Sequence, residues 1–287
     1  MRLRSLLFAP ANRPDLVEKF PRYPADLFVI DLEDGTPEPE RDAARRALPA
    51  LVAHLRRGGF ERRLLVRVNQ PRSPRFEPDV AAAASCAADG VMIPKLESED
   101  DLRRAGALLE AAPGAPRGVI GLVETAAGIV NVEALARAGP PLWALAFGAE
   151  DLVTELGGRR TAEGVEVLYA RSRLVLAAKA ARIGALDQVV VDIRDAERFR
   201  RDAAFGRQLG YDGKMCLLPR QVELANEIFS PAPDEIERSR RLLAAFEEGR
   251  RAGRGVIEFE GTMIDEPLVR RARAILELAS EDAPGGA

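Results

Sequence analysis

Short apolar runs, each ending at a turn-forming or charged residue, recur along the 287-residue chain. Segments whose apolar residues return at helical spacing lie between them, and this alternation is typical of βαβ units that build a parallel sheet. Eight strands alternating with helices favour a closed (β/α)8 TIM barrel, whose usual size is about 250 residues, over a doubly wound open sheet. The predicted strands are residues 5–10, 27–31, 64–69, 90–95, 118–124, 142–148, 187–192 and 213–218.

Helical spacing is clearest in three segments, residues 39–57, 97–112 and 165–184. No G-x-G-x-x-G sequence follows a predicted strand, so the chain lacks the phosphate-binding signature of a Rossmann fold. The pattern of the helices therefore agrees with the barrel better than with the open sheet.

The same pattern predicts two domains. The barrel accounts for residues 1–229, which we expect to form the catalytic domain. A Pro-rich joint then opens a C-terminal helical extension or lid, residues 230–287. Within this extension the sequence predicts a helix at about 233–252, a segment at 255–267, a last helix from about 267, and a disordered tail at 280–287.

Composition excludes several classes of protein. With 47% hydrophobic and 30% charged residues, the chain can bury a substantial core. A net charge of -3 gives no electrostatic sign of a nucleic-acid or membrane-surface partner. No run approaches the roughly 18 to 20 apolar residues of a membrane helix, and the apolar run near the N-terminus is too short for a signal peptide. Two cysteines are too few for a disulfide framework, so we expect a cytoplasmic protein with reduced thiols.

Charged and polar residues gather where the predicted strands end. Acids at one strand end are ordinary surface charge, but their recurrence at successive ends predicts a site, because a barrel carries its active site at the C-terminal ends of its strands. In chain order these residues are Asp31, Glu33 and Asp34, then Arg67 and Asn69, Lys95, Glu124, the group Gly148, Glu150 and Asp151, and Asp192.

Glu124 and Asp151 end neighbouring predicted strands, so we expect their carboxylates to converge. Two carboxylates close together repel each other, and a divalent cation relieves that repulsion. With oxygen ligands and no His or Cys nearby, Mg²⁺ is the predicted ion and Mn²⁺ the alternative, completed by water and substrate oxygens. A metal-free acid/base pair is the competing interpretation.

Arg67 and Lys95 each allow two interpretations. The planar guanidinium of Arg67 suits a substrate carboxylate held by two hydrogen bonds, and a salt bridge to Asp31 or Asp34 is compatible with that role. Lys95 is either a Schiff-base nucleophile or a charged structural partner. The one histidine, His54, falls on a helix predicted to face solvent, so catalysis by histidine is not expected.

Seven motif segments follow one another along the chain: RSLLFAPANRPDL, VIDLEDGTP with AARRAL, VRVN, PKLES, LVETAAGIVN, FGAEDL and GTMIDEP. Together they resemble the citrate lyase beta subunit-like family of metal-dependent aldolases, which act on oxo acids and coenzyme A thioesters. The resemblance runs from Arg4 to about Leu276.

The resemblance implies a TIM barrel with a C-terminal extension, assembled as a homotrimer or a multiple of trimers. It implies that Glu124 and Asp151 bind Mg²⁺ and that Arg67 and Glu124 contact the oxo acid. Asp265 would come from a neighbouring subunit and act as acid/base, whereas its residue type alone suggests an N-cap of the last helix. Four further candidates complete the site: Glu33 and Asp34 as catalytic carboxylates, and Arg13 and Lys19 as partners of the coenzyme A phosphates.

The implied activity is that of a Mg²⁺-dependent carbon–carbon lyase, or the reverse synthase. It would cleave a malyl-, citramalyl- or citryl-like thioester into an oxo acid and an acetyl thioester, with coenzyme A as part of the substrate. Alternatives are a malate-synthase-like enzyme, a malyl thioesterase, a citrate lyase subunit acting on an acyl carrier protein, a Schiff-base aldolase using Lys95 or Lys214, and a non-catalytic regulatory protein that binds metal and oxo acid.

Two positions depart from the family pattern. Ala11 follows Pro10 where the family has glycine. In GKMCLLPRQ, Leu218 occupies the position of a histidine that the family commonly has, although Gly213 and Gln221 match. The missing imidazole is the feature that keeps the regulatory alternative open.

Overall fold

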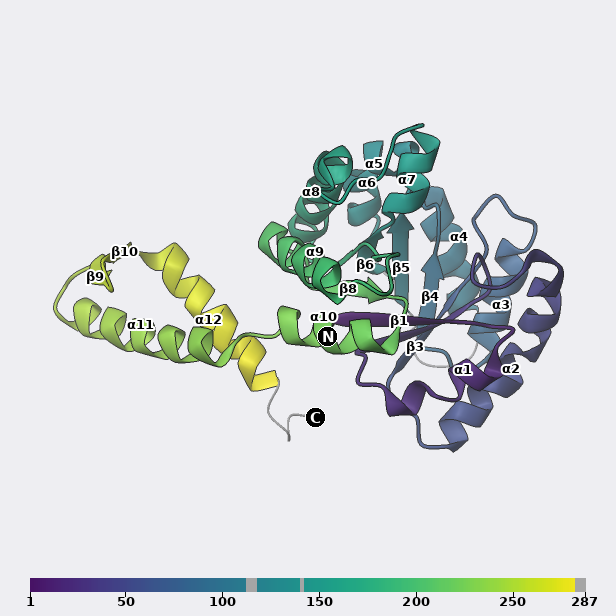
Figure 1. Cartoon of the computed structure of the whole chain (residues 1–287), viewed down its shortest axis with the longest axis horizontal. Helices are drawn as coiled ribbons and strands as arrows, with labels where there is room; N and C mark the ends of the chain where they lie inside the picture. Colours follow the sequence, from purple (N-terminus) through teal and green to yellow (C-terminus); the bar gives the residue numbers. More distant parts are fainter. Residues whose placement is uncertain (112–117, 140–141, 282–287) are drawn as a thin grey trace. The chain divides into compact units, whose positions relative to one another are not determined.

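A computed structural model describes residues 1–111, 118–139 and 142–281 of the chain. The chain divides into two compact units, Met1–Phe229 and Ser230–Ala287. Among the described residues of the first unit, eight parallel strands close into a barrel in chain order, β8 pairing with β1, and helices surround the strands (Figure 1). The predicted (β/α)8 barrel is confirmed. The strands are β1 (Ser5–Pro10), β2 (Leu27–Asp31), β3 (Arg63–Arg67), β4 (Gly90–Ile93), β5 (Gly118–Val123), β6 (Leu142–Phe147), β7 (Gly184–Asp187) and β8 (Gly213–Cys216).

The prediction for the seventh strand is wrong. β7 ends at Asp187, where the predicted strand 187–192 begins. The three valines after Gln188 have high β-propensity, but they lie in the loop that follows the strand, and Val191 is exposed. Asp192 is also exposed in this loop and therefore does not end a strand.

Local sequence signals determine several helix ends. The Ser98 hydroxyl accepts the N–H of Asp101, whose carboxylate accepts the N–H of Ser98, and this capping box starts α4. The Asp195 side chain caps α9, and Gly210, with a φ of 101°, ends it in the left-handed conformation that favours glycine. The helices of the first unit are α1 (Pro14–Val17), α2 (Arg41–Arg57), α3 (Phe76–Ser85), α4 (Glu99–Glu110), α5 (Ala126–Val130), α6 (Val132–Arg137), α7 (Ala149–Glu155), α8 (Val165–Ala180), α9 (Ala196–Leu209) and α10 (Pro219–Phe229), with 3-10 turns η1 (Phe20–Arg22) and η2 (Glu38–Glu40).

The three predicted helices of the barrel correspond to α2, α4 and α8. Residue 112, the predicted end of the second, lies outside the described residues.

Alternate residues of each strand face opposite sides of the barrel wall. Val29, Leu65 and Leu122 belong to the cluster that fills the barrel interior, whereas Phe28 and Ile30 belong to the larger core between strands and helices. Because side chains two residues apart on a strand point the same way, this alternation also fixes which residues at the strand ends point into the mouth.

The second unit is built from two helices and a hairpin. Its elements are α11 (Pro233–Arg251), the antiparallel strands β9 (Ile257–Phe259) and β10 (Thr262–Ile264), and α12 (Glu266–Glu281). The hairpin, which the sequence pattern did not predict, turns at Glu260 and Gly261, whose positive φ values of 52° and 74° are typical of two-residue hairpin loops. Its core consists of Leu242, Phe246, Ile264, Val269 and Ala272.

The predicted disordered tail starts too early. Ser280 and Glu281 belong to α12, and the remainder of the tail lies outside the described residues. Across the part of the chain that the structure describes, no helix combines the length and apolar character needed to cross a membrane.

Candidate active site at the barrel mouth

The alternation along the strands brings three predicted site residues into the mouth of the barrel. Asp31, Arg67 and Glu124 each follow an interior-facing core residue by two positions. Together with Asp34 and Asp151 they line a cavity of about 400 Å³. The sequence therefore predicted correctly where the polar side chains of this mouth gather.

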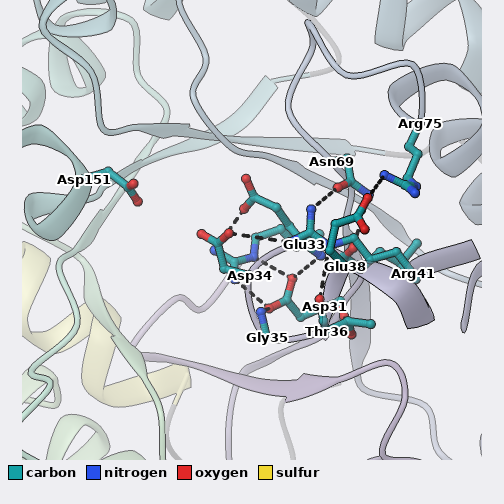
Figure 2. Close-up of polar contacts among 12 residues, drawn as sticks. Asp31, Glu33, Asp34, Gly35, Thr36, Glu38, Arg41, Asn69, Arg75 and Asp151 are labelled. Carbon is teal, nitrogen blue, oxygen red and sulfur yellow. Dashed lines mark hydrogen bonds and ion pairs between the residues drawn. The ribbon is translucent and has the colours of Figure 1, made fainter. Parts of the chain in front are cut away.

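Asp31 holds Arg67 in one orientation. The Arg67 Nε and Nη2 atoms donate to the two Asp31 oxygens at 2.7 and 2.6 Å, and the guanidinium lies 5.2 Å from the ring centroid of Phe8. Asp31 also accepts the N–H groups of Glu33 and Gly35 (Figure 2). The structure thus contains the salt bridge to Asp31, and because a guanidinium has five N–H donors, a second pair remains for a substrate carboxylate.

Two glycines make room for these carboxylates. A Cβ atom at Gly35 would lie 2.3 Å from Asp31 Oδ2, and one at Gly148 would lie 2.5 Å from Glu124 Cβ and Oε2. Any larger residue would displace the carboxylate that it meets. Sequence reasoning identified neither role, although the glycine directly after the acids in VIDLEDGT was the available signal.

Glu33 is buried beside the mouth and is not among the residues that line the cavity. Its Oε1 accepts from Lys95 Nζ at 3.1 Å, while its Oε2, 3.4 Å from Arg67 Nη1, has no hydrogen-bond partner among the described atoms. Burial raises the pKa of Glu33 to about 7, against the opposing charge of Arg67. This position suits a residue that orients Arg67 and Lys95 better than one that contacts a ligand.

Glu124 directly follows β5 and is 4% exposed. Its Oε1 accepts the backbone N–H of Lys95 at 3.0 Å. Burial raises the pKa of Glu124 to about 8, and the nearby carboxylate of Glu33 adds to this shift. A cation that reached this carboxylate would therefore gain a strong electrostatic interaction.

Asp34, in the turn after β2, and Asp151, on α7, approach the same region. Asp151 lies in the first turn of α7 and points from that helix toward the other carboxylates (Figure 2). The Lys95 Nζ atom lies 3.7 Å from Asp151, 3.8 Å from Glu124 and 3.9 Å from Asp34. Glu124 and Asp151 therefore face one shared point, as their positions in the sequence predicted.

The remaining wall of the cavity is apolar. The sequence analysis did not predict this wall. The available signal was the alternation along β5 and β8, which turns Leu122 and Met215 inward. The apolar residues that line the cavity are Phe8, Pro10, Leu122, Ala149, Val189, Met215 and Leu217.

Leu218, at the position of the family's histidine, is half-buried at the start of α10 and does not line the cavity. Its N–H and that of Leu217 face the Gln221 Oε1 atom, at 3.3 and 2.7 Å. The contact with the cavity at this strand end is made by Leu217 instead.

Two other candidate residues face away from the cavity. Lys214 is fully buried, donates to Asp187 Oδ2 at 2.8 Å and lies 5.8 Å from the ring of Phe199 on α9. It therefore points from β8 toward the surrounding helices, and a Schiff base on Lys214 is incompatible with this position. Asn69 is also buried, and its Nδ2 donates to Asp79 on α3 at 2.6 Å.

Three predicted residues are not among those that line the cavity. Arg13 is exposed just before α1 and pairs with Asp15 at 2.8 Å, and Lys19 is half-buried after that helix. Asp265 belongs to the second unit, where its carbonyl accepts the N–H of Val269, so it occupies the N-cap position of α12. Their functional roles stay predictions.

The donors at the mouth fit Mg²⁺. Glu124 and Asp151 offer carboxylate oxygens on one cavity, and Asp34 lines the same cavity. Within the described ranges, no three Asp, Glu, His or Cys side chains form a complete metal site. Mg²⁺ commonly takes one or two protein carboxylates and completes its shell with water and substrate oxygens.

The raised pKa values predict that Mg²⁺ binds more tightly as pH rises. Glu124, a proposed ligand, loses its proton near a pH of about 8, and a carboxyl group must be deprotonated to bind a metal. Glu33, which loses its proton near a pH of about 7, adds negative charge beside the site without binding the metal. Both carboxyl pKa values are raised on folding, so the stability that they contribute to the metal-free protein is fully present below the ordinary carboxyl pKa and is lost as pH rises through these values. Mg²⁺ should offset that loss.

Calorimetric titration of Mg²⁺ and melting temperatures with and without the ion, between about pH 6 and 9, test this expectation. We expect the affinity to rise and the metal-free melting temperature to fall across the range. An affinity independent of pH would contradict it.

A parallel barrel that carries an oriented arginine and buried carboxylates at its C-terminal mouth defines a metal-dependent (β/α)8-barrel enzyme. The comparisons with known proteins agree with that class. The family model described as HpcH/HpaI aldolase/citrate lyase matches residues 4–219. The chain belongs to the HpcH/HpaI aldolase/citrate lyase family, which confirms the resemblance drawn from the sequence motifs.

Curated relatives and solved structures align over nearly the full chain. A citrate lyase subunit beta-like protein of Deinococcus radiodurans is 42% identical, covering 96% of both chains. The mitochondrial citramalyl-CoA lyase of Homo sapiens is 32% identical, covering 96% of this chain and 85% of its own. The structure of CitE from Mycobacterium tuberculosis in complex with magnesium, acetoacetate and coenzyme A has a TM-score of 0.79 and 35% identity, covering 96% of this chain and 97% of its own.

Proposed function

We propose that this protein is a Mg²⁺-dependent carbon–carbon lyase that cleaves a malyl-, citramalyl- or citryl-like coenzyme A thioester into an oxo acid and an acetyl thioester. One observation carries the proposal: Glu124, Asp151 and the oriented Arg67 line one cavity. Two comparisons support it, since a relative is named citramalyl-CoA lyase and a similar structure contains magnesium and coenzyme A.

Different residues of the mouth bind the metal and the substrate carboxylate. Glu124 and Asp151 would hold Mg²⁺, which when bound polarises the carbonyl oxygen that develops as the carbon–carbon bond breaks. Arg67 binds the substrate carboxylate through the donors that Asp31 leaves unused. The apolar wall excludes water from the reacting carbons.

Two carboxylates move the protons. Asp34 lines the cavity and accepts the proton of the substrate hydroxyl group as that group becomes a carbonyl. The bonding electrons pass to the thioester fragment as an enolate. Asp265 of a neighbouring subunit protonates its α-carbon, which gives the acetyl thioester. Arg13 and Lys19 remain candidates for the coenzyme A phosphates.

A Schiff-base route is not supported by the lysines of the mouth. Burial lowers the pKa of Lys95, but the charges of the surrounding carboxylates, Glu33 first, outweigh burial and raise it, so the amine stays protonated and a poor nucleophile. Lys214 faces away from the cavity. A malate-synthase-like or thioesterase outcome would use the same residues, as would an acyl carrier protein substrate.

Turnover tests the proposal. We expect acetyl coenzyme A, Mg²⁺ and one of glyoxylate, pyruvate or oxaloacetate to give a condensed thioester that mass spectrometry detects, and the isolated product to be cleaved again. Free coenzyme A released with a hydroxy acid would indicate synthase or thioesterase activity. Absence of any product, with the protein folded and loaded with Mg²⁺, would favour the non-catalytic alternative.

A homotrimer is part of the proposal, and α8 offers a surface for it. Val165, Tyr169 and Leu176 are each more than 70% exposed and lie at helical spacing on this helix. An apolar stripe of this kind is typical of an interface between protein chains.

The two cysteines are thiols, which agrees with a cytoplasmic location.

Subunit mixing tests the role of Asp265. The Asp265→Ala and Asp151→Ala proteins should each be inactive, and a mixture should regain part of the activity, because some sites would combine an intact metal site with an intact acid from the neighbouring chain. Exchange of subunits is checked by native mass spectrometry. If exchange occurs without any rescue, Asp265 does not act across an interface.

A further inference from the structure

Lys95 holds an unusual position at the mouth. It has a positive φ of 48°, a conformation that costs a residue with a side chain, and its own N–H donates to Glu124 Oε1 at 3.0 Å. The backbone is thus held so that the side chain points among the acids. A strained conformation at such a place suggests a role in function.

The ammonium group lies within 4 Å of four carboxylates. The distances from Nζ are 3.1 Å to Glu33, 3.7 Å to Asp151, 3.8 Å to Glu124 and 3.9 Å to Asp34. Two of these, Glu124 and Asp151, are the proposed metal ligands. A divalent cation bound to this pair would share its ligands with a positive charge, and at these distances the two cations repel each other strongly.

A second cavity provides an alternative position for the ammonium group of Lys95. Lys95 lines a separate hollow of about 230 Å³ that is also lined by Glu97, Asp101 and Glu155. Arg72 pairs with Glu97 there, so the three acids leave an excess of negative charge. The flexible four-carbon stem of a lysine allows its ammonium group to move between two acidic surroundings.

We propose that Lys95 is an internal cation of the active site, which neutralises the carboxylates of the metal-free protein and moves toward the second cavity when Mg²⁺ binds, and which thereby sets the affinity for the metal. This inference rests on the proposed metal site at Glu124 and Asp151. It assigns Lys95 a positioning role and no covalent step.

Mg²⁺ titration without substrate tests the proposal. We expect Lys95→Met to bind Mg²⁺ about tenfold more tightly than the unaltered protein, because the competing charge is gone. Lys95→Arg, which keeps the charge, should stay close to the unaltered protein. Lys179→Met is the matched control, since this lysine lies in the last turn of α8, pairs with Asp212 and should leave the affinity unchanged. The metal-free Lys95→Met protein should also melt at a lower temperature.

Nitrogen-15 labelling of lysine follows the ammonium group directly. The chain has lysines only at positions 19, 95, 179 and 214, so their signals can be assigned by substitution. Addition of Mg²⁺ should shift the Lys95 signal and leave that of Lys214, buried against Asp187, in place. This measurement uses the unaltered protein and holds even if Lys95→Met folds poorly.

The outcomes separate the two proposals. If the unaltered protein binds no Mg²⁺, the proposed metal site is wrong, and the proposed role of Lys95 is wrong as well. If it binds Mg²⁺ but Lys95→Met binds with equal or lower affinity, or the Lys95 signal does not respond, the metal site stands and the inference about Lys95 is overturned.

Discussion

Replacing Glu124 by Gln or Asp151 by Asn should abolish measurable Mg²⁺ binding and reduce turnover by about a thousandfold or more. Each change removes one negative charge and one metal ligand while it keeps the shape of the side chain. Glu124 is almost fully buried, so no other group can move easily into its place. Calorimetric titration of Mg²⁺ and initial rates measure the two effects.

Glu150 provides the matched control for this prediction. It lies beside Asp151 on α7 and lines the same cavity, but its carboxylate pairs with Arg160 at 3.0 Å. Glu150→Gln should therefore keep its Mg²⁺ affinity. An unchanged affinity in Glu124→Gln or Asp151→Asn would show that the metal is held elsewhere.

Replacing Arg67 by Lys should weaken oxo-acid binding by about 10- to 100-fold while Mg²⁺ binding is retained. Lysine keeps the charge but loses the planar pair of donors, and it cannot form the two parallel hydrogen bonds that now join Arg67 to Asp31. Titration of the oxo acid in saturating Mg²⁺ measures the loss.

Arg63→Lys is the control on the same strand. Arg63 starts β3, at the opposite end of the strand from the mouth, and stacks on Trp143 with 5.0 Å between the guanidinium and the ring centroid. The substitution should leave the oxo-acid affinity unchanged. Equal affinities for Arg67→Lys and the unaltered protein would refute the proposed carboxylate clamp.

The sequence predicted the barrel because its signal repeats. Eight apolar runs alternate with helical segments, and burial on both sides of each strand makes these runs nearly continuous. The seventh strand was the exception. Gly184–Asp187 is short and less apolar than the valines that follow it, so the pattern predicts a strand at the valines and a strand end at Asp192, which Asp192 does not occupy.

The direction of side chains was harder to predict than their positions. Asp31, Arg67 and Glu124 share the inward alternation of their strands, and the sequence therefore identified them correctly as residues of the mouth. Lys214 falls on the outward alternation of β8, which shows only once the strand register is known. The side chain of Lys95 points among the acids of the mouth because the residue has a positive φ, and no pattern of residue types predicts that φ.

In the second unit the sequence predicts the helices but not the two short strands. Its helices follow from their spacing, but β9 and β10 are three residues each, too short to establish an alternating pattern. What Asp265 contacts in an assembled protein depends on other chains, which one sequence does not contain.

Calorimetric titration of glyoxylate, pyruvate and oxaloacetate, with and without Mg²⁺, decides whether a metal held by Glu124 and Asp151 binds the oxo acid. We expect at least one of these oxo acids to bind only when Mg²⁺ is present and Glu124→Gln to abolish this binding. Binding of equal strength without Mg²⁺ would contradict it, because the oxo acid would then be held by Arg67 and the apolar wall alone.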